Sequence, residues 1–319
     1  MKFRTEIERT PCRWNINHKD GILMLGSCFT DNIGSMLRNA LFDVDINPFG
    51  TTFNPASIAS SLARIYDNSP FEPYELVERE GRWISMWHHS AMALPSQNET
   101  LRLINNRIFN AHQILASAQV LIITWGTAWV FERKSDGMLV NNCHKFPATD
   151  FNRQLLDVKE IADTYVMLFD VLWRLNPNLR VILTVSPVRH LSDGLSGNQI
   201  SKSKLRIAAD EICNRCGEDK VVYFPAYEAL NDDLRDYRYY ASDMVHPSDM
   251  AINYIYELFI DIFTNEQTRQ IAKECESYSR LAAHRVMNQN EAAIKAYCDK
   301  VLSAKTQLCK KYPYLSDRL

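Results

Sequence analysis

Short apolar runs alternate with longer segments of helical periodicity along most of the chain. Five runs rich in branched and aromatic side chains are typical of buried strands, and the segments between them repeat apolar residues every three or four positions. Strands that alternate with helices form a parallel sheet with helices on both faces. We therefore predict a three-layer α/β/α sandwich with a five-stranded parallel sheet. Its strands are Ile22–Leu25, Phe42–Ile46, Val120–Trp125, Val181–Ser186 and Val221–Phe224, and its helices are Asn32–Ala40, Pro55–Tyr66, Asn105–Ser117, Val158–Leu175, Ser201–Cys216 and Ala251–Phe263.

The same pattern sets the organisation of the chain. Residues 1–264 are predicted to form one α/β domain, with an inserted region at about 69–98 that is richer in aromatic and turn residues and suggests a small hairpin. Residues 265–319 read as a C-terminal extension of polar helices, which packs on the core, forms a lid or makes an oligomer contact.

Composition and charge narrow the function classes. The 319 residues carry a formal net charge of −2, which argues against a nucleic acid or an anionic membrane as the main partner. No apolar run reaches the roughly 20 residues of a membrane span. The start, from Met1 to Glu8, lacks the apolar stretch of a secretory signal. Eight cysteines without such a signal indicate reduced thiols and a cytoplasmic protein, in which the C-x-x-C pair Cys213 and Cys216 is structural.

Polar and turn residues follow every predicted strand. The carboxyl ends of parallel strands share one edge of a sheet, where ligands bind. The first strand runs into Gly26-Ser27-Cys28, and the chain reaches Asp243 and His246 after the fifth strand. The first strand must lie centrally for its exit to face both Gly50 and Gly126, so we predict the flavodoxin-like strand order 2-1-3-4-5.

A nucleophile, a base and a group that orients the base are all present at this edge. A hydroxyl or thiol on a strand-to-helix turn is typical of acyl transfer. Neighbouring side chains that leave a strand point in opposite directions, so one of Ser27 and Cys28 faces the site. We favour Cys28, because it lies farther from the strand and a thiol ionises more easily near a histidine. Ser27 is the alternative nucleophile, and a third interpretation has Cys28 as a small buried side chain that closes the turn.

Asp243 and His246 would act together on the nucleophile. His246 would take its proton and return it to the leaving group, while Asp243 would hold the imidazole in the right tautomer. The D-x-x-H spacing also fits a plain helix-entry turn, in which Asp243 accepts hydrogen bonds from local backbone amides. Both interpretations can hold together.

Several segments of the chain resemble the GSCFA-domain proteins, which are themselves similar to the GDSL/SGNH hydrolases. The resemblance extends to about residue 264 and implies a three-layer α/β fold of the kind that acts on esters. A gapless alignment with the first SGNH block places Cys28 on the nucleophile. The matching segments are Gly26–Thr30, Asn47–Gly50, Gly126–Trp129, Asn142–Lys145, Ser186–His190 and Asp243–Ser248.

The resemblance also implies an oxyanion hole and exposes a difference in it. SGNH enzymes use the nucleophile's N–H, a glycine N–H and an asparagine side chain. Gly50 matches the glycine, but Ala128 stands where the asparagine should be. The glycines Gly50 and Gly126 also fit a purely structural role in turns. The candidates to replace the asparagine are Asn54, Thr127, Asn142 and His144, of which Asn142 and His144 are the first choices because they follow the same strand.

The remaining polar residues are given structural roles. His88 and His89 are adjacent and have no accompanying carboxylate, so we predict no metal site. The basic residues after the fourth strand could bind a phosphate or an anionic leaving group such as coenzyme A, but we interpret them as a solvated loop and helix face. They are Arg189, His190, Lys202 and Lys204.

The sequence therefore predicts an acyl-transfer enzyme, an esterase or acylhydrolase, that forms a covalent intermediate on Cys28 or Ser27. Its substrate would be a small-molecule or carbohydrate ester, and no cofactor is expected apart from acyl-coenzyme A as a possible co-substrate. One alternative is an acyl-coenzyme A-dependent O-acyltransferase that modifies a carbohydrate. The other is a non-catalytic binding or scaffold protein on a hydrolase fold, which the loss of the asparagine at Ala128 suggests. Substrate, acceptor and oligomeric state are not determined by the sequence.

Overall fold

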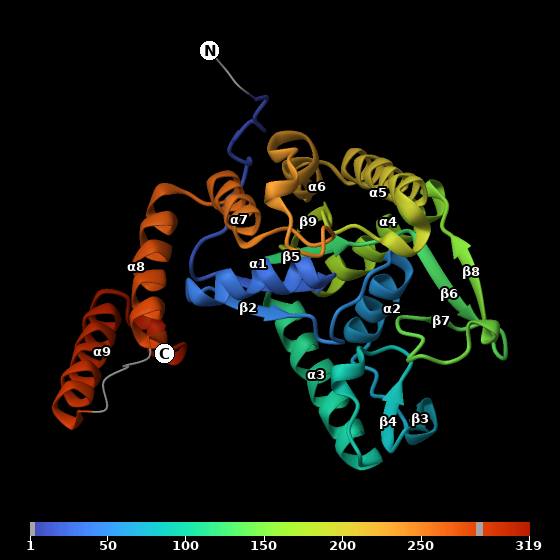
Figure 1. Ribbon diagram of the computed structural model, residues 1–319, viewed down its shortest axis with the longest axis horizontal. Coiled ribbons are helices and arrows are strands. Elements are labelled where there is room, and N and C mark those ends of the chain that lie inside the picture. Colours follow the sequence, from blue (N-terminus) through green and yellow to red (C-terminus); the bar gives the residue numbers. More distant parts are fainter. Residues whose placement is uncertain (1–3, 285–289) are drawn as a thin grey trace.

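A central parallel sheet organises the computed structural model, which describes residues 4–284 and 290–319. Met1 to Phe3, within the start for which no signal is expected, lie outside these residues. The sheet has the order β10-β9-β5-β1-β2, which is 2-1-3-4-5 in chain order (Figure 1). The predicted fold class and strand order are both confirmed. The strands are β1 (Gly21–Gly26), β2 (Asp43–Ile46), β5 (Val120–Trp125), β9 (Arg180–Val185) and β10 (Val221–Phe224).

Alternate residues of each strand face opposite helical layers. Leu23 and Leu25 of β1 pack in one buried cluster with apolar residues of four helices, α2 (Pro55–Tyr66), α3 (Gln97–Ser117), α4 (Val158–Leu175) and α5 (Gly194–Cys216). Ile22 and Met24 pack in a second cluster with α1 (Cys28–Asn39) and α7 (Asp249–Phe263). Both faces of the sheet are thus buried, as the continuous apolar character of its strands requires.

Three helices begin at least four residues earlier than their periodicity predicts, and two of them, α1 and α3, do so behind a polar cap. Helix α1 starts at Cys28, since Ser27 accepts a hydrogen bond from the Phe29 N–H and caps the helix. Helix α3 starts at Gln97 behind the cap of Ser96, and α5 starts at Gly194. The first correction matters most, because it places Cys28 in the first turn of a helix.

The inserted region forms the expected hairpin, with β3 (Leu76–Arg79) antiparallel to β4 (Arg82–Ser85). A second small antiparallel sheet is not predicted from the sequence. It consists of β7 (Leu139–Val140), β6 (Trp129–Arg133) and β8 (Phe151–Leu155), in that order. Strand β8 has three exposed polar residues at its centre and no apolar alternation, so its pairing with β6 leaves little trace in the hydrophobic pattern.

The C-terminal extension is helical, as predicted, with α8 (Glu266–Ala283) and α9 (Glu291–Lys311) side by side (Figure 1). The last residues return to the far end of α1, where Arg318 donates to the carbonyl oxygens of His18 and Leu41 at 2.9 Å each. The short helix α6 (Ala226–Glu228) follows β10. No helix within the described residues is long and apolar enough to cross a membrane.

The outer edge of the sheet at β2 is charged and covered. Arg107 of α3 donates to the Asp45 carboxylate at 2.9 Å and to the Ile46 carbonyl at 3.2 Å. Asp43 at the other end of the strand is exposed and lies 3.7 Å from Arg318. One backbone acceptor of strand β2, the Ile46 carbonyl, is therefore occupied, and charged side chains lie at both ends of the strand.

The turn after β1 depends on Gly26, so we predict that Gly26→Ala lowers the free energy of unfolding by about 2–4 kcal/mol. Gly26 has φ +155°, and a Cβ added there would lie 2.4 Å from the Thr124 carbonyl oxygen. Gly21→Ala in the same strand is the control, because the nearest atom to its added Cβ is 3.7 Å away. Urea unfolding measures both variants, and equal stability for the two would contradict the prediction.

Candidate active site

The β1–α1 turn separates the two candidate nucleophiles. The Ser27 side chain is 1% exposed and its hydroxyl caps α1, while its backbone N–H donates to the Thr124 carbonyl at 3.3 Å. Cys28 is partly exposed, and its backbone N–H donates to no carbonyl of the described residues. Of the two, Cys28 is therefore the more exposed residue, and it is the one whose N–H is not bound to a backbone carbonyl of the described residues.

Opposing influences act on the Cys28 thiol. Burial raises its pKa, and the negative charge of Asp31 raises it further. The backbone N–H groups of Phe29 and Cys28 and the positive charge of Lys202 lower it. The net shift is upward, so the resting group is a thiol, and any base at the site has a proton to remove.

A hydrogen-bond network joins α1 to the loop after β2. Asn47 has φ +48°, its Oδ1 accepts from the Gly26 N–H at 2.8 Å, and its Nδ2 donates to Asp31 at 2.7 Å. The Thr51 hydroxyl donates to the other oxygen of Asp31 at 3.2 Å. The network holds the loop against the first turn of α1, next to Cys28.

Gly50 occupies a crowded position in this loop. It has φ +73°, and an added Cβ would lie 2.5 Å from the Cβ of His89. Its N–H donates to the Asn47 carbonyl at 2.8 Å, so in this structure that donor closes a turn. The preceding residue, Phe49, stacks on His88 with ring centroids 4.7 Å apart. The role of Gly50 in an oxyanion hole stays a prediction.

The exits of β5 and β9 meet over Lys202, a residue whose sequence context favours the interpretation as part of a solvated face. That interpretation is wrong, because the side chain is 1% exposed and Nζ donates to the carbonyls of Gly126 at 2.6 Å and Ser186 at 2.7 Å. The signal in the sequence is weak: Lys202 falls on the same helical face as the apolar residues Leu205 and Ala209.

The four candidates for the missing oxyanion donor lie in different surroundings. The Thr127 hydroxyl pairs with Ser201 and accepts from the Trp129 N–H, while His144 Nε2 and the Ser85 carbonyl are 2.9 Å apart. Asn142 contacts the His144 N–H and, at 3.4 Å, Ser90. Asn54 caps α2 through Oδ1, and its Nδ2 donates to no described residue.

Neighbouring backbone bonds show where Asn54 and Asn142 sit. The Thr52 N–H donates to the Gly26 carbonyl and the Gly126 N–H donates to the Phe53 carbonyl, so the chain leading to Asn54 bridges the exits of β1 and β5. Asn142 and His144 instead bond to the inserted region. Asn141, which no sequence motif marks as a site residue, donates to the Thr51 carbonyl and the Thr52 hydroxyl at 3.3 Å each.

Asp243 and His246 form a pair before α7. His246 Nδ1 lies 2.7 Å from Asp243 Oδ2, and the other carboxylate oxygen accepts from the backbone N–H groups of Val245 and His246. These hydrogen bonds, first that of the imidazole, lower the Asp243 pKa to about 2. Both side chains are about half exposed, and His246 Nε2 has no hydrogen bond to Ser27, Cys28 or any other described residue. The geometry combines the two interpretations of this turn, and the link to the nucleophile stays a prediction.

A second aspartate–histidine pair lies close by. His190 Nδ1 is 2.9 Å from Asp193, whose side chain is 1% exposed and also pairs with Arg153. Burial, then the charges of Lys202 and Arg153, lower the His190 pKa. The Arg189 N–H donates to the Val245 carbonyl at 3.3 Å, so the loops that carry His190 and His246 touch.

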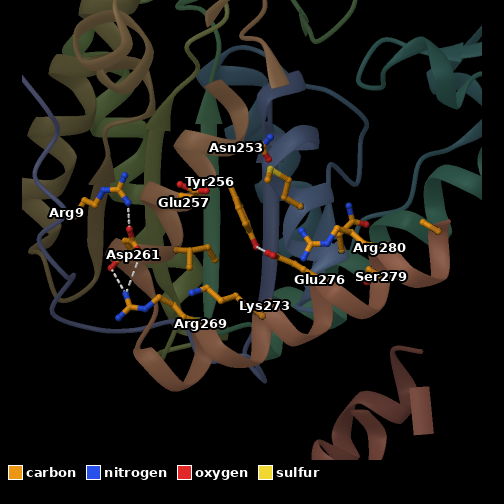
Figure 2. Close-up of a pocket in the computed structure, with 15 residues that line it drawn as sticks. Arg9, Asn253, Tyr256, Glu257, Asp261, Arg269, Lys273, Glu276, Ser279 and Arg280 are labelled. Atoms are coloured by element: carbon orange, nitrogen blue, oxygen red, sulfur yellow. Dashed lines mark hydrogen bonds and ion pairs between the residues drawn. The ribbon is translucent and has the colours of Figure 1, made fainter. Parts of the chain in front are cut away.

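A cavity of about 630 Å³ opens between α7, α8 and the far end of α1 (Figure 2). Met36, which lines it, is eight residues beyond Cys28 and so about 12 Å along the helix axis. Arg9 and Arg269 both pair with Asp261 in this cavity, and the Tyr256 hydroxyl donates to Glu276 at 3.0 Å. The cavity is thus separate from the strand ends.

Comparison with protein-family models identifies the family of this chain. The GSCFA family model matches residues 21–259, which span the sheet from β1 to β10 and most of α7. The chain belongs to the GSCFA family. The matched range contains both candidate nucleophiles and the Asp243–His246 pair of this GSCFA protein, and it ends before α8.

Several solved structures are similar to this chain. A carbohydrate esterase family 3 protein from Talaromyces cellulolyticus matches at 10% sequence identity with a TM-score of 0.37, and the match covers 80% of this chain and 99% of the esterase chain. An acetyl xylan esterase from Butyrivibrio proteoclasticus matches at 12% sequence identity with a TM-score of 0.38, and the match covers 77% of this chain and 63% of the esterase chain. The lipopolysaccharide acetyltransferase periplasmic domain of Salmonella ser. Paratyphi A matches at 14% sequence identity with a TM-score of 0.33. This match covers 76% of this chain and 83% of the Salmonella chain. These values carry no conclusion about activity. No curated protein matches the sequence.

The buried histidine beside Gly50 predicts acid sensitivity. Burial lowers the His88 pKa to about 3, whereas an unfolded histidine titrates near 6.5. Below about pH 6.5, His88 therefore binds a proton in the unfolded chain but stays neutral in the folded chain. The free energy of unfolding falls as the pH is lowered through this range. Linkage gives a loss of about 2 kcal/mol between pH 7 and 5 from this residue.

His88→Asn removes that titration while leaving a polar group for Ser85, which lies 2.9 Å from His88 Nδ1. We expect the stability difference between wild type and variant to shrink by about 2 kcal/mol from pH 7 to pH 5. Urea unfolding at the two pH values provides the measurement. Parallel pH profiles for the two proteins would show that His88 is not held neutral.

Proposed function

We propose that this protein is an acyl-transfer enzyme, an esterase or acylhydrolase of the SGNH type, with Cys28 as its nucleophile. The observation that carries the proposal is the partial exposure of Cys28 at the start of α1 and its N–H, which donates to no carbonyl of the described residues, beside a buried Ser27 whose hydroxyl and N–H are both in use. A nucleophile whose own N–H is unoccupied can hold the oxyanion that its attack creates.

His246 would serve as the base. Because Nδ1 faces a carboxylate, which can only accept, it carries the proton, and Nε2 is left with a lone pair. His246 Nε2 would take the Cys28 proton as sulfur bonds to the ester carbonyl carbon. The tetrahedral oxyanion then expels the alcohol, which leaves with that proton, and a thioester remains. Water or an acceptor hydroxyl would repeat the sequence, breaking the C–S bond and restoring the thiol.

Asn54 is the best-placed replacement for the asparagine lost at Ala128. Its Nδ2 is unpaired, and the residues before it bond to the exits of β1 and β5, whereas Thr127 and His144 are engaged elsewhere. With the Cys28 N–H it would supply two donors to the oxyanion. The substrate class we propose is a small-molecule or carbohydrate ester in the cytoplasm, with acyl-coenzyme A as the donor if the acceptor is a sugar hydroxyl.

An activated ester tests the nucleophile directly. With p-nitrophenyl acetate, we expect the wild type to gain one acetyl group, located on Cys28 by peptide mass spectrometry, and Cys28→Ala to form no acyl-enzyme. Ser27→Ala should still be acylated, although loss of the helix cap costs about 1 kcal/mol of stability. Acylation that survives in Cys28→Ala but is lost in Ser27→Ala would give the role to Ser27.

The two aspartate–histidine pairs allow a matched test of the base. We expect His246→Asn to slow acylation by about a hundredfold at pH 7, because the thiol then has no base to take its proton. His190→Asn is the control and should stay within a few fold of wild type. A larger effect of His190→Asn than of His246→Asn would assign the base to His190. If neither variant slowed acylation, a binding or scaffold role would be favoured. That role is the second candidate, because His246 Nε2 has no hydrogen bond to any described residue.

A further inference from the structure

The turn that carries Asp243 and His246 is a small loop whose backbone closes on itself. Within residues 241–247, the Met244 N–H donates to the Ala241 carbonyl at 3.0 Å, and the Ala241 N–H donates to the His246 carbonyl at 2.8 Å. Met244 has φ +59°, a left-handed conformation that persists in a non-glycine residue only where surrounding contacts hold it. The side chains of Asp243 and His246 are about half exposed, so burial does little to fix their position.

Two neighbouring carbonyls of this turn accept hydrogen bonds from one residue, Arg189. The Met244 carbonyl accepts from the Arg189 guanidinium at 3.1 Å, and the Val245 carbonyl accepts from the Arg189 backbone N–H at 3.3 Å. Within the part of the chain that the structure describes, these are the only hydrogen bonds that join residues 241–247 to a segment outside 237–248. Arg189 is therefore the residue that ties the turn to the rest of the protein.

Arg189 is itself held in place. Its guanidinium lies 4.1 Å from the ring centroid of Tyr240 and 5.2 Å from that of Tyr237, and a planar cation is attracted to aromatic faces. Its backbone follows Ser186, the first residue after β9, whose N–H donates to the Trp125 carbonyl of β5 at 2.8 Å. A continuous set of contacts thus runs from the sheet through Arg189 to the turn.

We propose that Arg189 is a positioning residue for His246, which fixes the turn to the end of β9 so that the imidazole keeps its contact with Asp243. The carbonyl of Val245 is held by Arg189, while its N–H donates to the Asp243 carboxylate at 2.9 Å. A displacement of Val245 would therefore move the group that orients the ring. The catalytic meaning of this contact rests on the proposed acyl transfer, but the state of the imidazole can be measured without it.

A residue that merely stabilised the loop would raise the free energy of unfolding without setting the state of the imidazole. Two measurements distinguish that role from positioning. One is the tautomer of His246, which depends on whether the ring stays against its carboxylate. The other is the division of a kinetic effect between the rate at saturating ester and KM, since a residue that orients the base affects the rate alone.

Long-range ¹H–¹⁵N NMR spectra show which nitrogen of a neutral imidazole carries the hydrogen, and His246→Asn identifies the signals of His246. In the wild type we expect the Nδ1–H tautomer, because Nδ1 faces the Asp243 carboxylate. In Arg189→Met we expect this single tautomer to be lost to a mixture, because a loosened turn lets the ring leave the carboxylate. A single Nδ1–H tautomer in folded Arg189→Met would overturn the proposal.

Arg238→Met is the matched control. Arg238 lies in the same loop, its side chain is 70% exposed, and it pairs with Asp236 at 2.9 Å rather than with the turn. We expect the wild-type spectrum, and a mixture of tautomers in this variant would mean that loss of any cation loosens the loop, against the proposal. Arg189→Gln is a second variant in case Arg189→Met does not fold. It keeps a polar end but is too short to reach the Met244 carbonyl, so it should also give the mixture, and a single tautomer would count against the proposal.

Acylation by p-nitrophenyl acetate gives the second measurement. Arg189→Met should lower the rate at saturating ester by about tenfold and leave KM unchanged, because Arg189 holds the base and not the ester. Arg189→Lys should restore most of that rate, since an ammonium can donate to the same carbonyl. A raised KM at an unchanged rate would make Arg189 an ester-binding residue and would overturn the positioning role.

These readouts separate the proposal from the function it refines. A mixture of tautomers in Arg189→Met, with no acyl-enzyme even in the wild type, would support the positioning role and contradict acyl transfer. Acylation on Cys28 that is as fast in Arg189→Met as in the wild type, with His246 in one tautomer, would do the reverse.

Discussion

The close approach of three backbone segments at Gly26 is the constraint on which the site depends. The end of β1 is held by the Thr124 carbonyl of β5 on one side and by Asn47 and Thr52 of the β2 loop on the other. A side chain at residue 26 would collide with the Thr124 carbonyl and with the Thr30 hydroxyl of α1. The convergence of the three segments fixes the direction in which α1 leaves the sheet, and with it the position of the first helical residue, Cys28.

Much of the framework could be predicted from the sequence, because it follows from local patterns. The buried strands read as apolar runs, and strand order followed from the requirement that the exits of β1, β2 and β5 meet. The small sheet of β6, β7 and β8 could not be read this way, since β8 presents polar residues to solvent and is held by pairing with a distant strand. Long-range pairing of polar strands has no local signature.

The residues of the candidate site could be predicted only in part from the sequence, for a related reason. Cys28 and the Asp243–His246 pair can be predicted because each belongs to a motif of a few consecutive residues, Gly26–Thr30 and Asp243–Ser248. Lys202 was misread because a lone lysine in a helix is usually solvated, and only the three-dimensional packing of α5 under two strand ends shows that it is buried. Asn54 and Asn141 owe their positions to the β2 loop crossing over β1 and β5, which periodicity does not reveal.

The charged edge at β2 has a consequence for how two folded copies of the chain meet. Asp43 is exposed and the Ile46 carbonyl is already bound by Arg107. A further extended segment that approached β2 would therefore meet a charged side chain and would find one of the backbone acceptors occupied. Two copies that meet at this edge would bring aspartates together, which opposes strand addition. Growth of the sheet beyond β2 into an intermolecular aggregate is therefore disfavoured at the place where a parallel sheet would otherwise be open to it.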